Sequence, residues 1–199
     1  MKAILCHSYG PPENLTLEEV ADPVAAENEV VVEVYAASLN FPDGLQIQGK
    51  YQFQPPMPFT PGSEIGGVIK STGTSVTGFT VGDRVMATPG LGGLAEQVSV
   101  ATGGLRKIPD SMDFKTAAGF AMVYTTSYYA LKQRADLQPG ETLLVLGASG
   151  GVGLAAVELG KLMGAEVIAA ASTEEKLQFV DRLHPDHLLN YGDGELKER

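Results

Sequence analysis

The sequence predicts an α/β protein with a β-rich first part and a parallel βαβαβ unit in its second part. In the first part, the segments 29–35 and 66–69 are rich in β-branched residues, and Pro- and Gly-rich stretches separate them. Many short strands joined by such turns are typical of a small barrel or sandwich. After Pro109, strand-like and helix-like segments alternate with short links, which indicates a parallel sheet.

The elements of the second part are expected in a regular order. Residues 113–137 favour helix and end at a Pro-Gly pair. A short apolar strand follows at 142–146, and an apolar helix at 152–163 ends before Gly164. The remaining expected elements are a strand at 166–171, a helix at 174–183, a weaker strand at 187–190 and a third helix that begins near Glu195.

Composition and charge exclude several classes of protein. The chain has 199 residues, of which 44% are hydrophobic, so it can bury a sizeable core. The formal net charge of −10 argues against a nucleic-acid partner, because phosphate binding requires clustered Lys and Arg. No apolar stretch approaches the roughly 20 residues that span a bilayer, and the chain runs from Met1 directly into a strand-like segment. We therefore expect a cytoplasmic protein with no membrane partner.

Cys6 is the only cysteine, so an intramolecular disulfide and a site with several cysteine ligands are excluded. Its apolar surroundings favour a buried strand thiol over a reactive one.

A glycine-rich segment lies between the strand at 142–146 and the helix that follows it. It reads Gly-Ala-Ser-Gly-Gly-Val-Gly over residues 147–153. Glycines allow a tight turn and a close approach of a ligand, and a helix N-terminus offers free N–H groups to a pyrophosphate. The spacing differs from the strict GxGxxG pattern, and a structural turn is the alternative. Its place inside a βαβ unit favours dinucleotide binding through Gly150, Gly151, Val152 and Gly153.

The end of the second strand of this unit indicates which dinucleotide binds. NAD-binding units usually carry an acidic residue there, which binds the ribose 2′-hydroxyl. This chain has Ser172 at that position, and Lys176 follows one helical turn later. We therefore predict NADPH, with Lys176 near the 2′-phosphate. The alternative is a purely structural capping box formed by Ser172 and Glu175.

With these motifs, the chain resembles the zinc-independent quinone oxidoreductases of the medium-chain dehydrogenase/reductase superfamily over essentially its whole length. The segments that carry the resemblance are 38–43, 49–51, 58–64, 82–85, 124–127 and 147–153. The resemblance implies a GroES-like barrel domain at 1–118, followed at 119–199 by the first half of a Rossmann domain that binds NADPH. It further implies a chain truncated within the Rossmann domain, and a homodimer for a full-length relative.

The resemblance also implies roles for individual residues. Asn40 and Asp43 match residues on the nicotinamide side of the active site, with a pair that caps a loop as the alternative reading. Tyr51 matches a tyrosine that donates a proton in enoyl-thioester reductases, or it packs the substrate pocket. The further cofactor contacts implied are Thr126, Ser172, Lys176 and Tyr191.

No metal is expected. Zinc-dependent relatives carry a cysteine and a histidine where this chain has Asn40 and Ser63. Without a metal to stabilise an alkoxide, hydride transfer from NADPH to a quinone or another conjugated carbonyl is the expected reaction. Two alternatives stay open: an enoyl-thioester reductase, and a non-catalytic cofactor-binding or structural protein of the crystallin kind.

Overall fold

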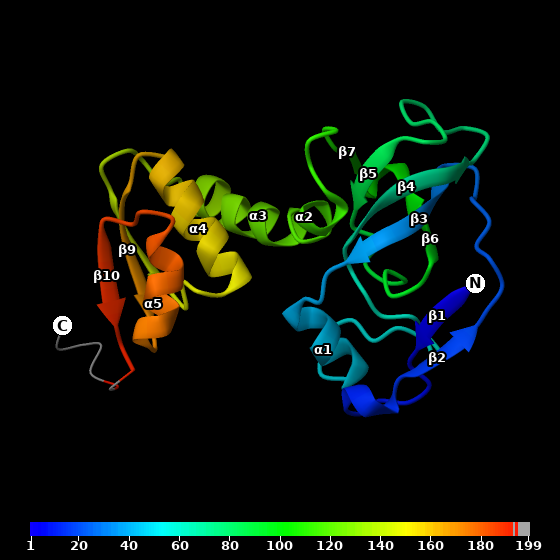
Figure 1. The fold of residues 1–199 in the computed structure, drawn as a ribbon, viewed down its shortest axis with the longest axis horizontal. Helices are drawn as coiled ribbons and strands as arrows, with labels where there is room; N and C mark the ends of the chain where they lie inside the picture. Colours follow the sequence, from blue (N-terminus) through cyan, green and yellow to red (C-terminus); the bar gives the residue numbers. More distant parts are fainter. Residues whose placement is uncertain (193, 195–199) are drawn as a thin grey trace. The chain divides into compact units, whose positions relative to one another are not determined.

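The computed structural model describes residues 1–192 and Gly194, and the chain divides into two compact units (Figure 1). Unit 1 comprises Met1–Ala121 and unit 2 comprises Met122–Arg199. We describe each unit by itself. The domain boundary that we expect after residue 118 stays a prediction.

Unit 1 is built on a curled sheet of five antiparallel strands with the order β6-β3-β4-β5-β7 (Figure 1). The strands are β3 (Glu29–Ala37), β4 (Ile65–Thr72), β5 (Arg84–Ala87), β6 (Gln97–Ala101) and β7 (Leu105–Lys107). Alternate residues of these strands, among them Val30, Val32, Ile65 and Val85, point to one side and form the core. The β-rich first domain predicted from the sequence is confirmed.

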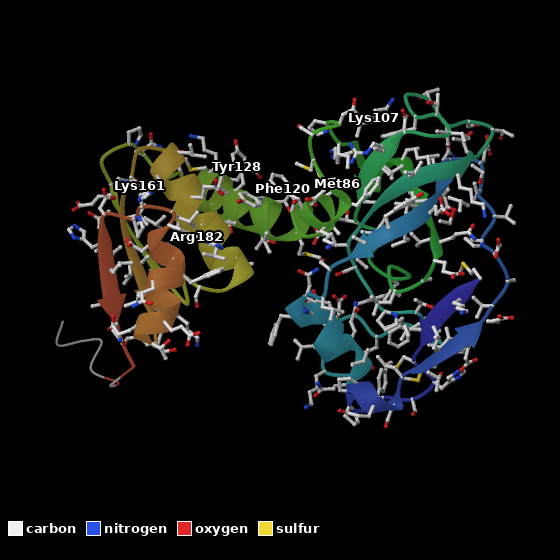
Figure 2. The ribbon with its side chains drawn as sticks, viewed as in Figure 1. Met86, Lys107, Phe120, Tyr128, Lys161 and Arg182 are labelled. Atoms are coloured by element: carbon white, nitrogen blue, oxygen red, sulfur yellow. The ribbon has the colours of Figure 1, made fainter. Side chains whose placement is uncertain are left out.

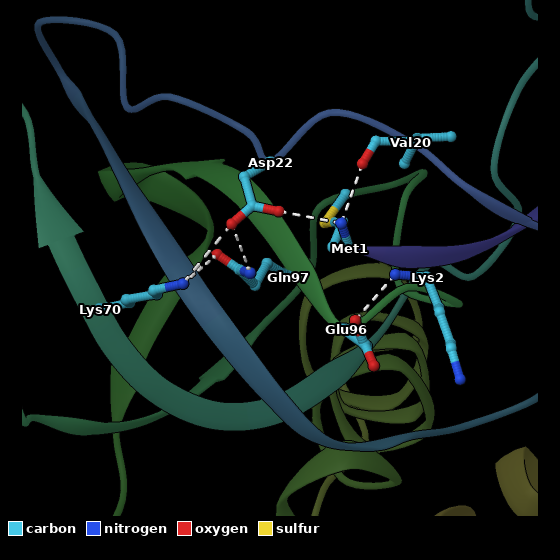
Figure 3. Close-up of polar contacts among 7 residues, drawn as sticks. All are labelled: Met1, Lys2, Val20, Asp22, Lys70, Glu96 and Gln97. Atoms are coloured by element: carbon cyan, nitrogen blue, oxygen red, sulfur yellow. Dashed lines mark hydrogen bonds and ion pairs between the residues drawn. The ribbon is translucent and has the colours of Figure 1, made fainter.

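A two-stranded sheet of β1 (Lys2–Leu5) and β2 (Thr16–Glu19) attaches to the larger sheet through the bridge from Ala3 to Ala95. Figure 3 shows the polar contacts that hold it: the Met1 ammonium donates to Asp22 Oδ1 at 3.0 Å, and the Lys2 backbone N–H donates to Glu96 Oε2 at 2.7 Å. The Met1 ammonium, Gln97 and Lys70 together hold the pKa of Asp22 below its usual range. These contacts therefore favour the ionised form of Asp22.

Two short helices complete unit 1, with 3-10 turns η1 (Pro12–Asn14) and η2 (Thr102–Gly104). α1 (Phe41–Ile47) follows β3, and α2 (Phe114–Ala118) packs on β4. A side chain at Gly66 would place its Cβ 2.5 Å from the Phe114 carbonyl oxygen, so a glycine is required for this close approach. Cys6 is 1% exposed and pairs with Phe59 as an isolated bridge, which confirms the buried thiol. Burial raises the pKa of this thiol.

Unit 2 contains a three-stranded parallel sheet with the order β10-β9-β8. Its elements are α3 (Ala121–Tyr128), η3 (Tyr129–Arg134), β8 (Thr142–Leu146), α4 (Gly151–Leu162), β9 (Glu166–Ala171), α5 (Glu174–Asp181) and β10 (His187–Asn190). The predicted alternation of strands and helices is confirmed. The helix expected near Glu195 lies outside the described residues.

Gly160 of α4 packs closely on the sheet, because a Cβ there would lie 2.6 Å from a methyl group of Leu143 and 3.1 Å from one of Val167. At the end of the same helix Lys161, labelled in Figure 2, pairs with Asp186 at 2.6 Å. Asp186 also accepts a hydrogen bond from the Val167 N–H at 2.7 Å, so the pair connects α4, β9 and the segment before β10.

The single helical segment expected at 113–137 is divided into three. Gly119 ends α2, and its N–H reaches back to the carbonyls of Lys115 and Thr116. After α3, the chain widens into a π-helical turn, η3, in which the Ala135 N–H bonds to the Ala130 carbonyl at 2.9 Å. The helical character predicted for this region is confirmed. The end of α2 and the π-helical turn depend on local packing that the sequence pattern does not show.

In the described part of the chain, no helix is both long and apolar enough to cross a membrane.

Candidate functional site

The glycine loop predicted to bind a dinucleotide connects β8 to α4 in unit 2. Gly147 has a φ of +65°, a conformation that residues with a side chain rarely adopt. At Gly153 a Cβ would lie 2.4 Å from the Gly147 carbonyl oxygen and 2.8 Å from Ala148 Cα. One glycine therefore makes the turn possible, and the other lets the helix start pack against it.

The start of α4 presents backbone N–H groups that have no partner within the helix. Gly150 is the N-cap, and the Leu154 N–H donates to the Gly150 carbonyl at 2.8 Å. The amides of Gly151, Val152 and Gly153 precede this bond, and such amides have no partner within a helix. Together with the helix dipole they favour an anion. Val152 is 45% exposed, so this end of the helix is accessible.

Two side chains of α3 bind the loop and the helix that follows it. Ser127 is buried, and its hydroxyl donates to the Val152 carbonyl at 2.8 Å. Tyr124 donates a hydrogen bond to Glu158 in the middle of α4, and the Glu158 carboxylate raises the pKa of Tyr124 to about 12. Thr126, the predicted cofactor contact, is exposed. In the same segment Ser127 contacts the loop, and the sequence pattern of 124–127 does not distinguish it from Thr126.

The end of β9 brings two predicted 2′-phosphate residues together. Lys176 Nζ donates to Ser172 Oγ at 3.1 Å. The alternative reading of Ser172 as the first residue of a capping box with Glu175 is wrong. Thr173 is the N-cap of α5, with φ −146° and ψ 154°, and its hydroxyl accepts from the Lys176 N–H at 3.3 Å. Ser172 lies one residue too early to cap, so its hydroxyl is available to Lys176.

Neighbouring groups complete the polar surface at this strand end. The loop is tied to β9 because the Ala148 N–H donates to the Ala170 carbonyl at 3.0 Å. The Tyr191 N–H donates to the Ala171 carbonyl at 3.0 Å, so Tyr191 follows β10 directly beside Ser172. Asn190 binds the nearby carboxylate of Glu174 at 2.6 Å. Asn190 was not predicted, and no sequence motif marks it.

In unit 1, Asn40 and Asp43 lie at the start of α1. Asn40 is the N-cap, and its backbone N–H donates to Asp43 Oδ2 at 2.7 Å. The capping reading of this pair therefore has a structural basis. Both residues also line a pocket of about 500 Å³ within unit 1. The other lining residues are Ile4, Pro12, Leu15, Leu39, Gly44, Ile47, Pro61 and Leu94.

Tyr51 is partly exposed and does not belong to the lining of this pocket. Ser63 stands where zinc-dependent relatives carry a histidine. Its side chain is buried, and within the described residues its hydroxyl has no hydrogen-bond partner. No three His, Cys, Asp or Glu side chains among residues 1–192 and Gly194 gather as a metal site would require.

Comparison with known proteins identifies the relatives of this chain. Residues 26–110 match the model of the alcohol dehydrogenase GroES-like domain, and residues 151–199 match that of the zinc-binding dehydrogenase domain. The quinone oxidoreductase-like protein 2 of Bos taurus is 39% identical over 198 residues, which are 99% of this chain and 56% of the relative.

Two solved structures show the same fold. The quinone oxidoreductase of Thermus thermophilus, solved alone and with NADPH, is 38% identical, with a TM-score of 0.86 over 97% of this chain and 61% of that one. The CurK enoyl reductase is 29% identical, with a TM-score of 0.89 over 99% of this chain and 63% of that one.

The chain spans about half the length of the curated relatives it matches. The matched domains follow the order of the two units, and the predicted GroES-like barrel and partial Rossmann fold are confirmed. The chain thus carries the domains of an alcohol dehydrogenase-like oxidoreductase and is similar to quinone oxidoreductases of the medium-chain dehydrogenase/reductase superfamily.

Proposed function

We propose that this protein is an NADPH-dependent reductase that delivers a hydride to a quinone or another conjugated carbonyl compound without a metal ion. The observation that carries the proposal is the Ser172–Lys176 pair at the end of β9, beside the glycine loop. A hydroxyl and an ammonium at this position suit a 2′-phosphate, whereas an acidic residue would suit the free 2′-hydroxyl of NAD.

The residues present fit the dinucleotide. Gly151, Val152 and Gly153 would supply backbone N–H groups for the pyrophosphate, and Gly147 allows the turn that precedes them. Ser172, Lys176 and Tyr191 would hold the 2′-phosphate. Thr126 would contact the nicotinamide half. The structure of the Thermus thermophilus relative with NADPH supports this cofactor.

Bound NADPH would supply the hydride, and the protein would supply orientation and hydrogen bonds. Asn40 and Asp43 would orient the reacting partners from the start of α1. Asn40 and Ser63 are poor substitutes for a thiolate and an imidazole, which supports chemistry without zinc. A conjugated carbonyl compound suits a site without a metal, because it accepts a hydride without a metal ion to stabilise an alkoxide.

The likeness to the CurK enoyl reductase supports a second candidate, reduction of an enoyl thioester. In that case Tyr51 would donate the proton to the substrate carbon, which requires its hydroxyl to reach the substrate.

The proposal is tested by measuring NADPH oxidation with a panel of quinones, enones and enoyl thioesters, using this chain and any longer parent protein. We expect turnover with quinones or simple enones. A strong preference for thioesters would favour the second candidate. Tight NADPH binding with no turnover on any acceptor would instead indicate a non-catalytic cofactor-binding protein.

A further inference from the structure

Gly44 is a glycine that the fold of unit 1 does not require. It lies in the middle of α1 and has no positive φ, so a residue with a side chain can adopt its backbone conformation. A Cβ built there meets no atom within 4 Å outside its own stretch of helix. At Gly66 and Gly153, by contrast, a Cβ would lie 2.5 and 2.4 Å from a carbonyl oxygen. Glycine is also less favourable than alanine within a helix, so neither conformation nor packing explains it here.

The position of Gly44 on the helix supplies a reason. The part of the chain around α1 contributes four residues to the pocket of about 500 Å³, and these are Asn40, Asp43, Gly44 and Ile47. Their spacing of three and four residues places them on one face of the helix, with Gly44 near the middle of that face. A side chain at position 44 would therefore extend into the pocket, and glycine leaves this space open.

The rest of the pocket lining is apolar. It consists of Ile4, Pro12, Leu15, Leu39, Pro61 and Leu94, which come from other segments of unit 1. The two polar residues, Asn40 and Asp43, bind one another in the capping box of α1. Shape and apolar contact therefore dominate the choice of ligand. The pocket volume lies within the range of about 300–1,000 Å³ that is usual for drug-sized ligands, which are larger than a single substituted ring.

We propose that Gly44 is a specificity-determining residue: it keeps the pocket wide enough for acceptors in which the quinone or enone ring is fused to a second ring. This role rests on the proposed function, since it assigns the acceptor to the pocket that Asn40 and Asp43 line. The second ring occupies the space that a side chain at position 44 would fill, and it contacts the apolar lining. Monocyclic acceptors bind less tightly, because they bury less apolar surface.

The test measures the affinity of the full chain for two quinones by equilibrium dialysis, without cofactor. Duroquinone has one ring, and 2,3-dimethyl-1,4-naphthoquinone has the same dimethylquinone edge fused to a benzene ring. We expect the wild type to bind the bicyclic quinone about 4- to 15-fold more tightly, the gain from one to two more buried carbon atoms. In Gly44→Leu the new side chain occupies the space of the second ring, so this ratio should fall to one or below.

Two further variants make the test specific. Gly44→Ala adds one methyl group, so its ratio should lie between those of the wild type and Gly44→Leu. Its melting temperature should rise, because alanine favours the helix and meets no clash. Gly103 likewise has no positive φ and no atom within 4 Å of a built Cβ, but it does not line the pocket. Gly103→Leu should therefore keep the wild-type ratio.

Several results would overturn this role of Gly44. They are no binding of either quinone, equal affinity of the wild type for both, or a wild-type ratio in Gly44→Leu (in Gly44→Ala, if the leucine variant does not fold). A lower melting temperature of Gly44→Ala, or loss of the ratio in Gly103→Leu, would also contradict it.

The proposed function fails or stands separately, because it is measured by NADPH oxidation. Quinone turnover together with a wild-type ratio in Gly44→Leu would refute only the role of Gly44. The expected ratios without turnover on any acceptor would refute only the reductase activity.

Discussion

The Gly153→Ala substitution tests whether the glycine loop is built for close contact with the helix start. The new Cβ would lie 2.4 Å from the Gly147 carbonyl oxygen and 2.8 Å from Ala148 Cα, and both are backbone atoms that cannot rotate away. Overpacking that forces backbone shifts costs about 1–3 kcal/mol. Replacing glycine by alanine within a helix stabilises that helix by about 1 kcal/mol. We therefore expect a net loss of up to about 2 kcal/mol in the stability of unit 2.

Gly151→Ala is the matched control, because it makes the same change two residues earlier in the same helix. Its Cβ would lie 3.0 Å from Val123 Cγ1, a side-chain atom that can yield. The difference between the two variants therefore isolates the backbone clash, at about 1–3 kcal/mol. Hydrogen exchange of the amides in β8, α4 and β9 measures the opening free energy locally. Equal protection in the two variants would refute the steric account of this loop.

Three further predictions concern the metal, the reaction and the pH dependence. The purified chain should hold no stoichiometric zinc after mild chelation, and elemental analysis near one zinc per chain would contradict this. In a longer parent protein, Tyr51→Phe should lower enone turnover by about 10²–10⁴-fold if the hydroxyl donates a proton. Quinone turnover should fall less, because solvent can protonate the quinone oxygen. If the turnover of neither substrate changes, Tyr51 only packs against the substrate pocket. Because the pKa of Asp22 is lowered in the folded chain, its stabilisation is present above the unfolded pKa of about 3.9 and is lost as the pH falls through the folded value. Asp22→Asn should therefore lower the melting temperature at pH 7 and have little effect near pH 2, whereas an equal loss at both pH values would exclude a role for the charge.

The elements of unit 2 could be predicted from the sequence because their signals are local. The apolar strand at Thr142–Leu146 is followed by a glycine-rich turn and an apolar helix, and each of these features depends on neighbouring residues. The same holds for β9 and β10, whose predicted bounds agree with the structure. The division of the segment before β8 was missed, because a π-helical turn depends on packing rather than on propensity.

The candidate site was predictable in its positions and less so in its contacts. The place of Ser172 and Lys176 after β9 predicts both as 2′-phosphate contacts, and the structure brings their side chains together. The choice between Ser172 and Thr173 as helix cap could not be made from the sequence, since both residue types cap helices and only the backbone angles distinguish them. The contacts of Glu64 with Ser38 and Asn40 could not be predicted, because these residues are remote in the chain and meet only in the folded unit.

The most direct test of the proposed NADPH site is the affinity of Lys176→Ala for NADPH and NADH. Lys161→Ala is the control, because it removes another lysine of unit 2 whose partner, Asp186, lies away from the glycine loop. If Lys176 binds the 2′-phosphate, its loss should weaken NADPH by about 1–3 kcal/mol and leave NADH nearly unchanged. An equal loss for both cofactors in a folded protein, or no loss for either, would contradict the proposed site.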